Sequence, residues 1–375
     1  MRSTAHTAAR IVLVALIVAG SLDVALAQRP RLTDQVRQAR SQPQSSRTSR
    51  VNVELLTGKD NVALRAQQWG RLFAKLGISA RIRSARGDEQ PEIRESTAGS
   101  VRRVTAIGRI HRTGDLIFPD RTFSFDESSK LTEWLGSLAD YGAQGSPEGQ
   151  SLWGLNEKQF AAAYEALSQP LEQAIHGAEL KVALERFELD GDLPIRLSDE
   201  ASAWLARNSS KLPKVRQELQ SLSKGTALAI LLNGYGLEFH PTRTRDAKVE
   251  LAVVRADTTD DVWPIGWDLK HSRGRTAPSL YQMVPVEFDD VPLLDLLDVV
   301  SEQSKVPIRF DVYRIEQEEA DLEGTRVTHP RKNVALAGVV LRAVAAANLR
   351  SLLRIDERGR PFLWVTTVEA AAGRR

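Results

Sequence analysis

Residues 284–310 read VPVEFDDVPLLDLLDVVSEQSKVPIRF, and the apolar period changes twice within this short stretch. The apolar residues of 284–288 alternate, which predicts a strand. The next apolar residues recur at helical spacing, and Pro292 falls in the first turn of the helix that they predict. These residues are Leu293, Leu296, Leu297 and Val300. Residues 308–310 return to a strand pattern, so the stretch predicts the start of a mixed module with the order strand, helix, strand.

The sequence that follows completes this module. A second helical stripe is predicted by Leu336, Val339, Val340, Ala343 and Ala347. Leu353 and Ile355 alternate into a turn at residues 356–359 (DERG), and residues 362–365 (FLWV) predict the returning strand. Residues 283–370 therefore predict one module of the β-α-β-β-α-β-β type.

An earlier part of the chain repeats this pattern weakly. Residues 193–197 (LPIRL) match residues 306–310 (VPIRF), and residues 227–231 (ALAIL) match residues 335–339 (ALAGV). Because the matches occur in the same order, we expect a first module over residues 169–256. A linker is expected over residues 257–282.

A third, different unit is expected before the repeat. Residues 51–55 alternate like a strand, residues 61–76 carry a helical stripe, and residues 112–115 (RTGD) predict a hairpin turn. Asp126 is a candidate N-cap for a further helix, and residues 156–159 (NEKQ) predict a capping box. Residues 51–168 are therefore expected to form an N-terminal domain, and the fold class of the whole chain is α+β.

The second module resembles the short N-terminal module of secretins and TonB-dependent receptors. The resemblance is carried by residues 286–288 (VEF), 292–297 (PLLDLL), 306–310 (VPIRF), 334–336 (VAL) and the terminal hairpin to 362–365, with Asp311 directly after the strand. It covers about residues 283–368 and extends more weakly to 171–255. Most of the chain is also similar to larger exported proteins of planctomycete-type bacteria. No barrel sequence follows the module in this chain, so the resemblance implies protein–protein contact in the periplasm and implies no channel.

The first 27 residues have the three parts of a cleavable signal peptide. Arg2 and Arg10 precede the apolar run 11–19, and residues 25–27 (ALA) fit the cleavage pattern before Gln28. The apolar run is shorter than the roughly 20 residues of a spanning helix, which makes an uncleaved anchor the weaker interpretation. The chain has no cysteine, so neither disulfides nor a lipid-modified cysteine are expected. We therefore predict a periplasmic or extracellular protein with no transmembrane span after cleavage.

Charge is concentrated in a segment that directly follows the predicted cleavage site. Residues 28–50 carry a net charge of +5 and are rich in Gln, Ser and Arg, whereas residues 51–375 carry −3. This segment is expected to be a disordered linker, and electrostatic contact with anionic lipid or wall polymer is a second interpretation. The balance argues against nucleic acid as a partner.

The sequence contains no complete set of catalytic motifs. Residues 221–224 (SLSK) fit S-x-x-K, but the S-D-N and K-T-G elements that accompany it in penicillin-binding enzymes are missing. The chain has no H-E-x-x-H, no Walker-type phosphate loop and no G-x-S-x-G, so no cofactor, metal site or catalytic residue is predicted. The favoured function is a non-catalytic binding or assembly protein with an envelope or periplasmic protein partner. A hydrolase acting on wall polymer or glycan and a glycan or small-molecule binder remain as alternatives.

Five residues are candidates for ligand contact. Tyr141 and Gln144 belong to a glycine-rich loop at residues 141–149, and Trp153 follows that loop. Trp263 and Trp267 lie in the linker between the modules. Aromatic rings and amides suit stacking and hydrogen bonding to a sugar, but a loop closed by glycines and a buried plug of tryptophans are the alternative interpretations.

Overall fold

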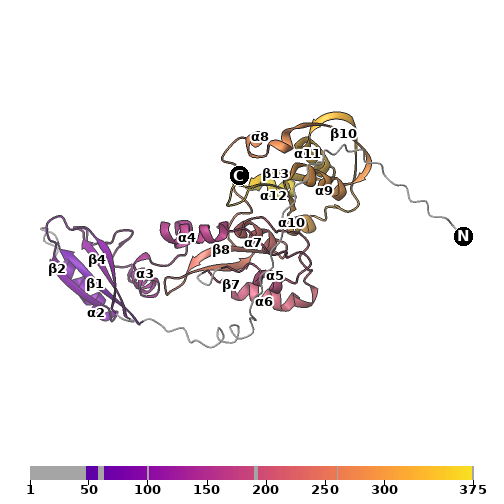
Figure 1. The fold of residues 1–375 in the computed structure, drawn as a ribbon. Coiled ribbons are helices and arrows are strands. Elements are labelled where there is room, and N and C mark those ends of the chain that lie inside the picture. Colours follow the sequence, from indigo (N-terminus) through magenta and orange to yellow (C-terminus); the bar gives the residue numbers. More distant parts are fainter. Residues whose placement is uncertain (1–47, 58–62, 99–100, 190–192, 260, 374–375) are drawn as a thin grey trace, which may run out of the picture. The chain divides into compact units, whose positions relative to one another are not determined.

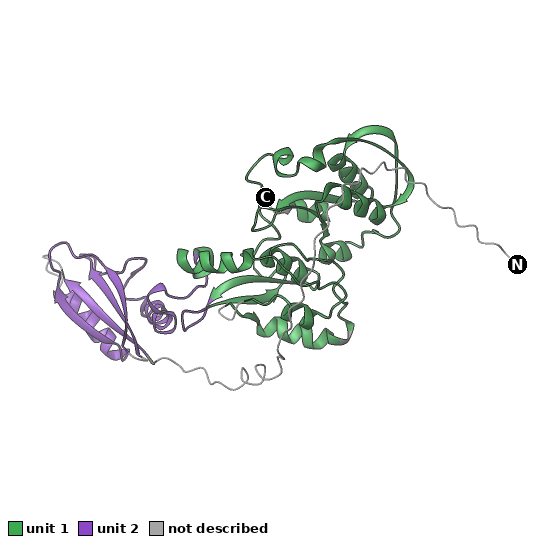
Figure 2. Ribbon diagram, viewed as in Figure 1, with its two compact units in different colours: residues 1–11, 151–242, 249–375 green, residues 12–150, 243–248 purple. Residues whose placement is uncertain are grey.

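Helices and separate small sheets share the chain, which confirms the α+β class. The computed structural model describes residues 48–57, 63–98, 101–189, 193–259 and 261–373. The predicted signal peptide and residues 28–47 of the predicted linker lie outside these residues. Two compact units are present (Figure 2). The N-terminal unit comprises the described residues up to Gln150 with Arg243–Lys248, and the C-terminal unit comprises the other described residues from Ser151 onward.

The N-terminal unit is built on one mixed sheet. Its elements are β1 (Thr48–Thr57), α2 (Ala63–Lys75), β2 (Ser79–Ser84), β3 (Glu92–Ala98), β4 (Val101–Ile110), β5 (Leu116–Ile117), β6 (Thr122–Phe123), α3 (Ser128–Tyr141) and η1 (Gly142–Gln144). The strand order is β2-β1-β4-β5-β6, and β3 pairs with β4. Strand β1 pairs in parallel with both β2 and β4. It begins at Thr48, three residues inside the predicted linker, because Thr48 already pairs with Val101.

Both helices of this unit pack on one face of the sheet. Trp69 and Phe73 of α2 and Trp134 of α3 share a buried cluster with Val53 and Leu55 of β1. The predicted turn at residues 112–115 is confirmed between β4 and β5. The predicted N-cap of α3 is wrong, since the helix begins at Ser128 and Asp126 does not cap it.

The C-terminal unit begins before the predicted first module. Its first elements, η2 (Ser151–Gly154) and α4 (Glu157–Ser168), were predicted to belong to the N-terminal domain 51–168, and that boundary is wrong because Ala163 and Leu167 are buried in the core of the C-terminal unit. The first module follows with α5 (Leu180–Glu185), β7 (Ile195–Leu197), α6 (Asp199–Asn208), η3 (Ser209–Lys211), α7 (Lys224–Asn233), β8 (Leu237–Arg243) and β9 (Val249–Arg255). The predicted capping box at the start of α4 is confirmed, with reciprocal bonds between Asn156 and Gln159.

The second module follows the expected order of elements. It contains α8 (Arg273–Thr276), η4 (Pro278–Tyr281), β10 (Met283–Pro292), α9 (Leu293–Ser304), β11 (Ile308–Phe310), α10 (Val312–Gln317), β12 (Arg326–Ala335), α11 (Leu336–Ala346), β13 (Leu349–Ile355), β14 (Pro361–Thr367) and α12 (Val368–Gly373). Figure 1 shows α9 and α11 close together in this module. Pro292 is the N-cap residue of α9 instead of lying in its first turn.

The two modules share a three-stranded sheet of the same topology, but only the second has an additional two-stranded sheet among the described residues. The strand orders are β7-β9-β8 and β11-β14-β13, and the first strand runs parallel to the last in each. The prediction that the first module also has a leading strand and a strand before its second helix is wrong for its described residues. An isolated bridge between Pro170 and Ser223 stands where the second module pairs β10 with β12. Directly after the first strand of each three-stranded sheet the chain forms a helix, α6 in the first module and α10 in the second, because the side chains of Ser198 and Asp311 accept hydrogen bonds from Ala201 N and Arg314 N and cap these helices.

Strand β14 joins the two modules into one body. Successive side chains of a strand point to opposite faces, and here each face meets a different core. Phe362 and Trp364 belong to the apolar cluster of the first module, whereas Leu363 and Val365 belong to that of the second. The predicted linker 257–282 is packed as well, since Trp263 and Ile265 are buried in the first cluster.

Candidate functional site

The glycine-rich loop at residues 141–149, after α3, is held by the side chain of Arg243. Arg243 is only 2% exposed and donates to Tyr141 O at 2.8 Å and to Gly145 O at 2.6 Å. Gln144 O accepts a hydrogen bond from the Gln150 side chain at 2.8 Å. Burial lowers the pKa of the Arg243 guanidinium, which is the sign of a cation enclosed by protein. These hydrogen bonds hold the loop in place, and Tyr141 and Gln144 take part in them through their backbone oxygens.

The three tryptophan candidates meet in one aromatic cluster of the C-terminal unit. Trp263 stacks on Trp153 with ring centroids 5.8 Å apart and on Phe239 at 5.9 Å, and Trp267 meets it edge-on at 5.4 Å. Trp263 is 2% exposed, so both of its faces are covered by other rings. Trp153 is half-buried and donates to Asp261 O at 2.8 Å. Tyr141 and Gln144 belong to the other unit, so the structure does not gather the five candidates in one body.

A buried carboxylate anchors this cluster to the second module. Glu357 lies in the turn between β13 and β14, and its Oε1 accepts from Trp263 Nε1 at 2.7 Å. Its Oε2 accepts from Ser223 Oγ at 2.6 Å, from Thr226 N at 3.2 Å and from Thr226 Oγ1 at 2.9 Å. The neighbouring Asp356 accepts from Ser223 N at 3.1 Å. The carboxylate therefore caps the N-terminus of α7 from a distant part of the chain.

An open groove lies between the two modules and is here called the module groove. It has a volume of about 970 Å³. The first module contributes residues 216–218, and the second contributes α10, residues 319–323 and strand β11. An ion pair between Arg216 and Glu316 crosses it, and Arg314 of α10 pairs with Asp257 nearby. Ligand pockets commonly hold about 300–1,000 Å³, so the groove has room for a segment of a partner.

The module groove is predominantly acidic. Six carboxylates line it against two arginines and one histidine, and they are Glu218, Asp298, Glu316, Glu319, Asp321 and Glu323. Burial raises the pKa of Asp298, with smaller effects from the nearby Asp295 and Glu302. Burial lowers the pKa of Arg309, and the charges of Glu218 and Asp298 oppose that shift. The groove therefore offers an electrostatic environment that favours cationic side chains.

The edge of β11 forms part of the groove wall and is covered by side chains. Gln217 Oε1 accepts from Phe310 N at 2.8 Å, and Gln217 Nε2 donates to Phe310 O at 2.8 Å. Arg309 Nη1 donates to Ile308 O at 2.8 Å. Sequence analysis missed these residues because Arg309 looked like one position of a strand and Gln217 lies 93 residues from its partner.

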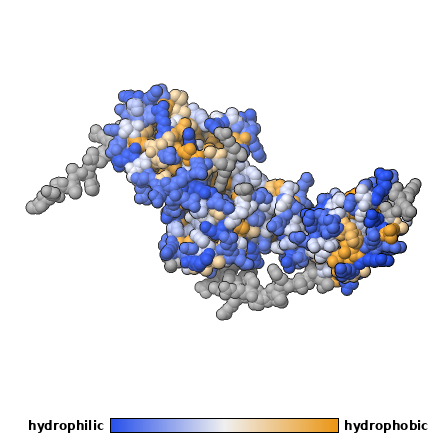
Figure 3. All heavy atoms as spheres, turned by 180° about the vertical axis from the view of Figure 1, so that it is seen from behind, coloured by the Kyte–Doolittle hydropathy of each residue, from blue (hydrophilic) through white to orange (hydrophobic). Residues whose placement is uncertain are grey.

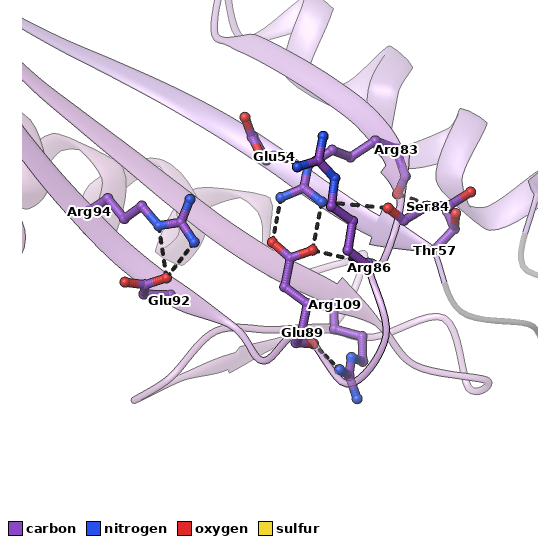
Figure 4. Close-up of polar contacts among 9 residues, drawn as sticks. All are labelled: Glu54, Thr57, Arg83, Ser84, Arg86, Glu89, Glu92, Arg94 and Arg109. Carbon is purple, nitrogen blue, oxygen red and sulfur yellow. Dashed lines mark hydrogen bonds and ion pairs between the residues drawn. The ribbon is translucent and has the colours of Figure 1, made fainter.

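The outer face of the N-terminal sheet carries a closed set of ion pairs (Figure 4). Arg83 Nε lies 2.7 Å from Glu54, and Arg83 Nη2 lies 2.6 Å from Glu89. Hydrogen bonding from Arg83 lowers the pKa of Glu89 to about 2. Arg94 pairs with Glu92 within β3 at 2.7 Å. Each of these acidic groups has a basic partner, so this set of residues is a weaker candidate for a charged ligand.

Other classes of site find little support in the part of the chain that the structure describes. No group of three or more His, Asp or Glu side chains there could hold a metal ion. No helix within the described ranges combines the length and hydropathy needed to cross a bilayer. On the face drawn in Figure 3, apolar residues form separate patches among hydrophilic ones.

The module groove is therefore the candidate site that the described geometry favours. Comparisons with models of protein families, with curated proteins and with solved structures found no match to this chain.

Proposed function

We propose that this chain is a non-catalytic binding protein that mediates protein–protein contacts in the periplasm or at the cell envelope. The module groove carries the proposal. It combines room for a peptide segment, a sheet edge in its wall and an excess of carboxylates over arginines. A groove of this kind suits recognition of a polypeptide, because backbone pairing and charge complementarity can act together.

The rigidity of the C-terminal unit supports the same function. Both faces of β14 are buried, one in each module core, and Glu357 fixes the turn of the second module on α7 of the first. The two walls of the groove are therefore held in place before a partner arrives. A preformed site binds without the cost of ordering its own walls, which favours affinity.

The order of elements in the second module supports the proposed class of protein. Apart from the short helix α10 between β11 and β12, the order β10-α9-β11-β12-α11-β13-β14 is the one that the resemblance to the secretin and TonB-receptor module implies. Export is also a proposal and rests on the sequence of residues 1–27, since the predicted signal peptide lies outside the described residues. N-terminal sequencing of the mature protein tests it, and we expect the first residue to be Gln28.

Site-specific photocrosslinking in intact cells tests the binding function. A photoreactive amino acid replaces Glu319 or Glu323, which are exposed in the groove, or Glu165, which is exposed on α4 outside it. We expect a discrete covalent adduct with another protein from the two groove positions and none from position 165. Adducts of equal yield at all three positions, or none at the groove positions, would contradict the proposal.

A further inference from the structure

The outward edge of β11 is defined by its own hydrogen bonds. Leu363 N donates to Pro307 O at 2.8 Å, and Asp311 N donates to Val365 O at 2.8 Å, so residues 307 and 311 face β14. Backbone groups alternate in direction along a strand. The backbone N–H and C=O groups of Ile308 and Phe310 therefore point away from β14. Strand β11 lies at the edge of its sheet. This edge faces the module groove, which Ile308 and Phe310 both line.

Two side chains cover this edge in the manner of a neighbouring strand. The amide of Gln217 bonds both the N–H and the C=O of Phe310, each at 2.8 Å, and these are the two bonds that an opposite residue makes in a hydrogen-bonded pair of antiparallel strands. The guanidinium of Arg309 covers Ile308 O at 2.8 Å. Arg309 Nε itself is buried and has no hydrogen-bond partner within the described residues. The edge is thus covered by groups that can rotate away.

We propose that an extended, basic segment of a protein partner adds as a strand to the β11 edge and takes the place of the Gln217 side chain. This inference rests on the proposed binding function and specifies the chemistry of the partner. Strand addition supplies affinity through backbone bonds, and the side chains around the edge supply selectivity. Here those side chains include Glu218, Asp298 and Glu319, which select lysine or arginine in the incoming strand.

Replacement of the Gln217 amide by a partner strand exchanges one pair of hydrogen bonds to Phe310 for another pair of the same kind. A neutral amide leaves two backbone groups, and two backbone groups of the partner take its bonds, so the number of hydrogen bonds at Phe310 stays the same. Gln217 is half-buried and its own amide can turn toward solvent. The segment that carries it stays anchored, since Val215 and Leu219 on either side are buried in the first core.

The test uses the full chain and a defined probe. The probe is a nine-residue peptide of alternating lysine and valine with blocked ends, and the comparison peptide has glutamate in place of lysine. Two further peptides are N-methylated on one or the other set of alternate residues. Binding is followed by the amide signal of Phe310 in nitrogen–proton spectra. Gln217→Ala removes the internal competitor, and Gln220→Ala is the matched control because its amide bonds Glu172 O outside the groove.

We expect the lysine peptide to bind and to shift the Phe310 signal, and the glutamate peptide to bind at least tenfold more weakly. Gln217→Ala should tighten binding about tenfold, since two hydrogen bonds no longer compete, whereas Gln220→Ala should leave it unchanged. Only one of the two N-methylated peptides should retain binding, because only one set of N–H groups faces β11.

The outcomes separate this inference from the binding function itself. Crosslinks at Glu319 and Glu323 together with no Phe310 shift at millimolar peptide would overturn strand addition and leave the binding function standing. Equal binding by both N-methylated peptides would also overturn strand addition. Self-association of Gln217→Ala without peptide binding would mean that Gln217 only protects the edge, which again contradicts the inference.

Discussion

Removing the Glu357 carboxylate should cost the C-terminal unit much of its stability. In Glu357→Ala, Trp263 Nε1 and Thr226 N lose their acceptor while they remain in a buried site. Each buried donor left unpaired costs about 1–3 kcal/mol, so together they should lower the free energy of unfolding by about 4 kcal/mol. The hydroxyls of Ser223 and Thr226 add little, because they can rotate to other acceptors.

The conservative variant should be intermediate. Glu357→Gln keeps the shape but replaces one acceptor oxygen with an NH₂ group, which must face either Trp263 N–H or the donors at the start of α7. We expect it to lose about 1–3 kcal/mol. Glu165→Ala is the control, because Glu165 is exposed on α4 and surface changes usually stay within about 0.5 kcal/mol.

The assay is urea unfolding of the full chain followed by tryptophan fluorescence, to which the cluster around Trp263 contributes. With a slope of about 2–3 kcal/mol per molar urea, a loss of about 4 kcal/mol lowers the midpoint of the transition by about 1.3–2 M. If Glu357→Ala and Glu165→Ala unfold at the same midpoint, water must reach the two donors after truncation. The assignment of Glu357 as a buried anchor would then be wrong.

Three further perturbations have expected signs that the structure fixes. Gly225→Ala should destabilise by about 1–3 kcal/mol in the same urea assay although alanine favours helices, because its Cβ would lie 2.8 Å from Trp263 Nε1 and against the Glu357 carboxylate; a gain in stability would contradict this packing. The ion pair with Arg83 lowers the pKa of Glu89 from its usual 4.5 to about 2, so its contribution to the stability of the folded state is present above about pH 4.5 and is lost as pH falls through 2. Thermal unfolding of Glu89→Gln between pH 2 and 7 should show a flatter profile in that window than the wild type, and parallel profiles would refute it. Asp298 has a raised pKa, so the folded state favours its neutral form and loses that advantage as pH rises; Asp298→Asn should be more stable than the wild type at pH 7 and equal to it near pH 3, and lower stability at pH 7 would contradict this sign.

The parts of the fold that could be predicted are those that local sequence determines. The change of apolar period across residues 284–310 predicted β10, α9 and β11, and Asn156 with Gln159 predicted the start of α4. Helix α6 was missed although Ser198, followed by two acids, is an ordinary start signal. We expected a polar insert at this place in both modules, so the helix that follows the strand in each, α6 after β7 and α10 after β11, was not predicted.

The candidate site could not be predicted because its contacts join distant residues. Gln217 and Phe310 are 93 positions apart, and Ser223 and Glu357 are 134 apart. Neither pair is visible in periodicity, since a glutamine in a loop and two acids in a turn are ordinary on a surface. Trp153 was considered with the glycine-rich loop and apart from Trp263 and Trp267, because the stacking of Trp153 and Phe239 on Trp263 can only be seen in three dimensions.

The terminal hairpins of the two modules have similar turns but contact opposite ends of helices. Thr244 N donates to Lys248 O and Ala247 N to Thr244 O, and the same two bonds join Asp356 with Arg360 and Gly359 with Asp356. The turns are therefore equivalent, and only the side chains differ.

In the N-terminal unit, Arg243 of the first hairpin donates to Tyr141 O, at the C-terminal end of α3, and to Gly145 O, at the C-terminal end of η1. In the C-terminal unit, Glu357 of the second hairpin accepts from Thr226 N at the N-terminal end of α7. A helix presents a partial negative charge at its C-terminus and a partial positive charge at its N-terminus. A cation at one hairpin and an anion at the other thus match the helix end that each meets, and exchanging the two charges would set like charge against like at both.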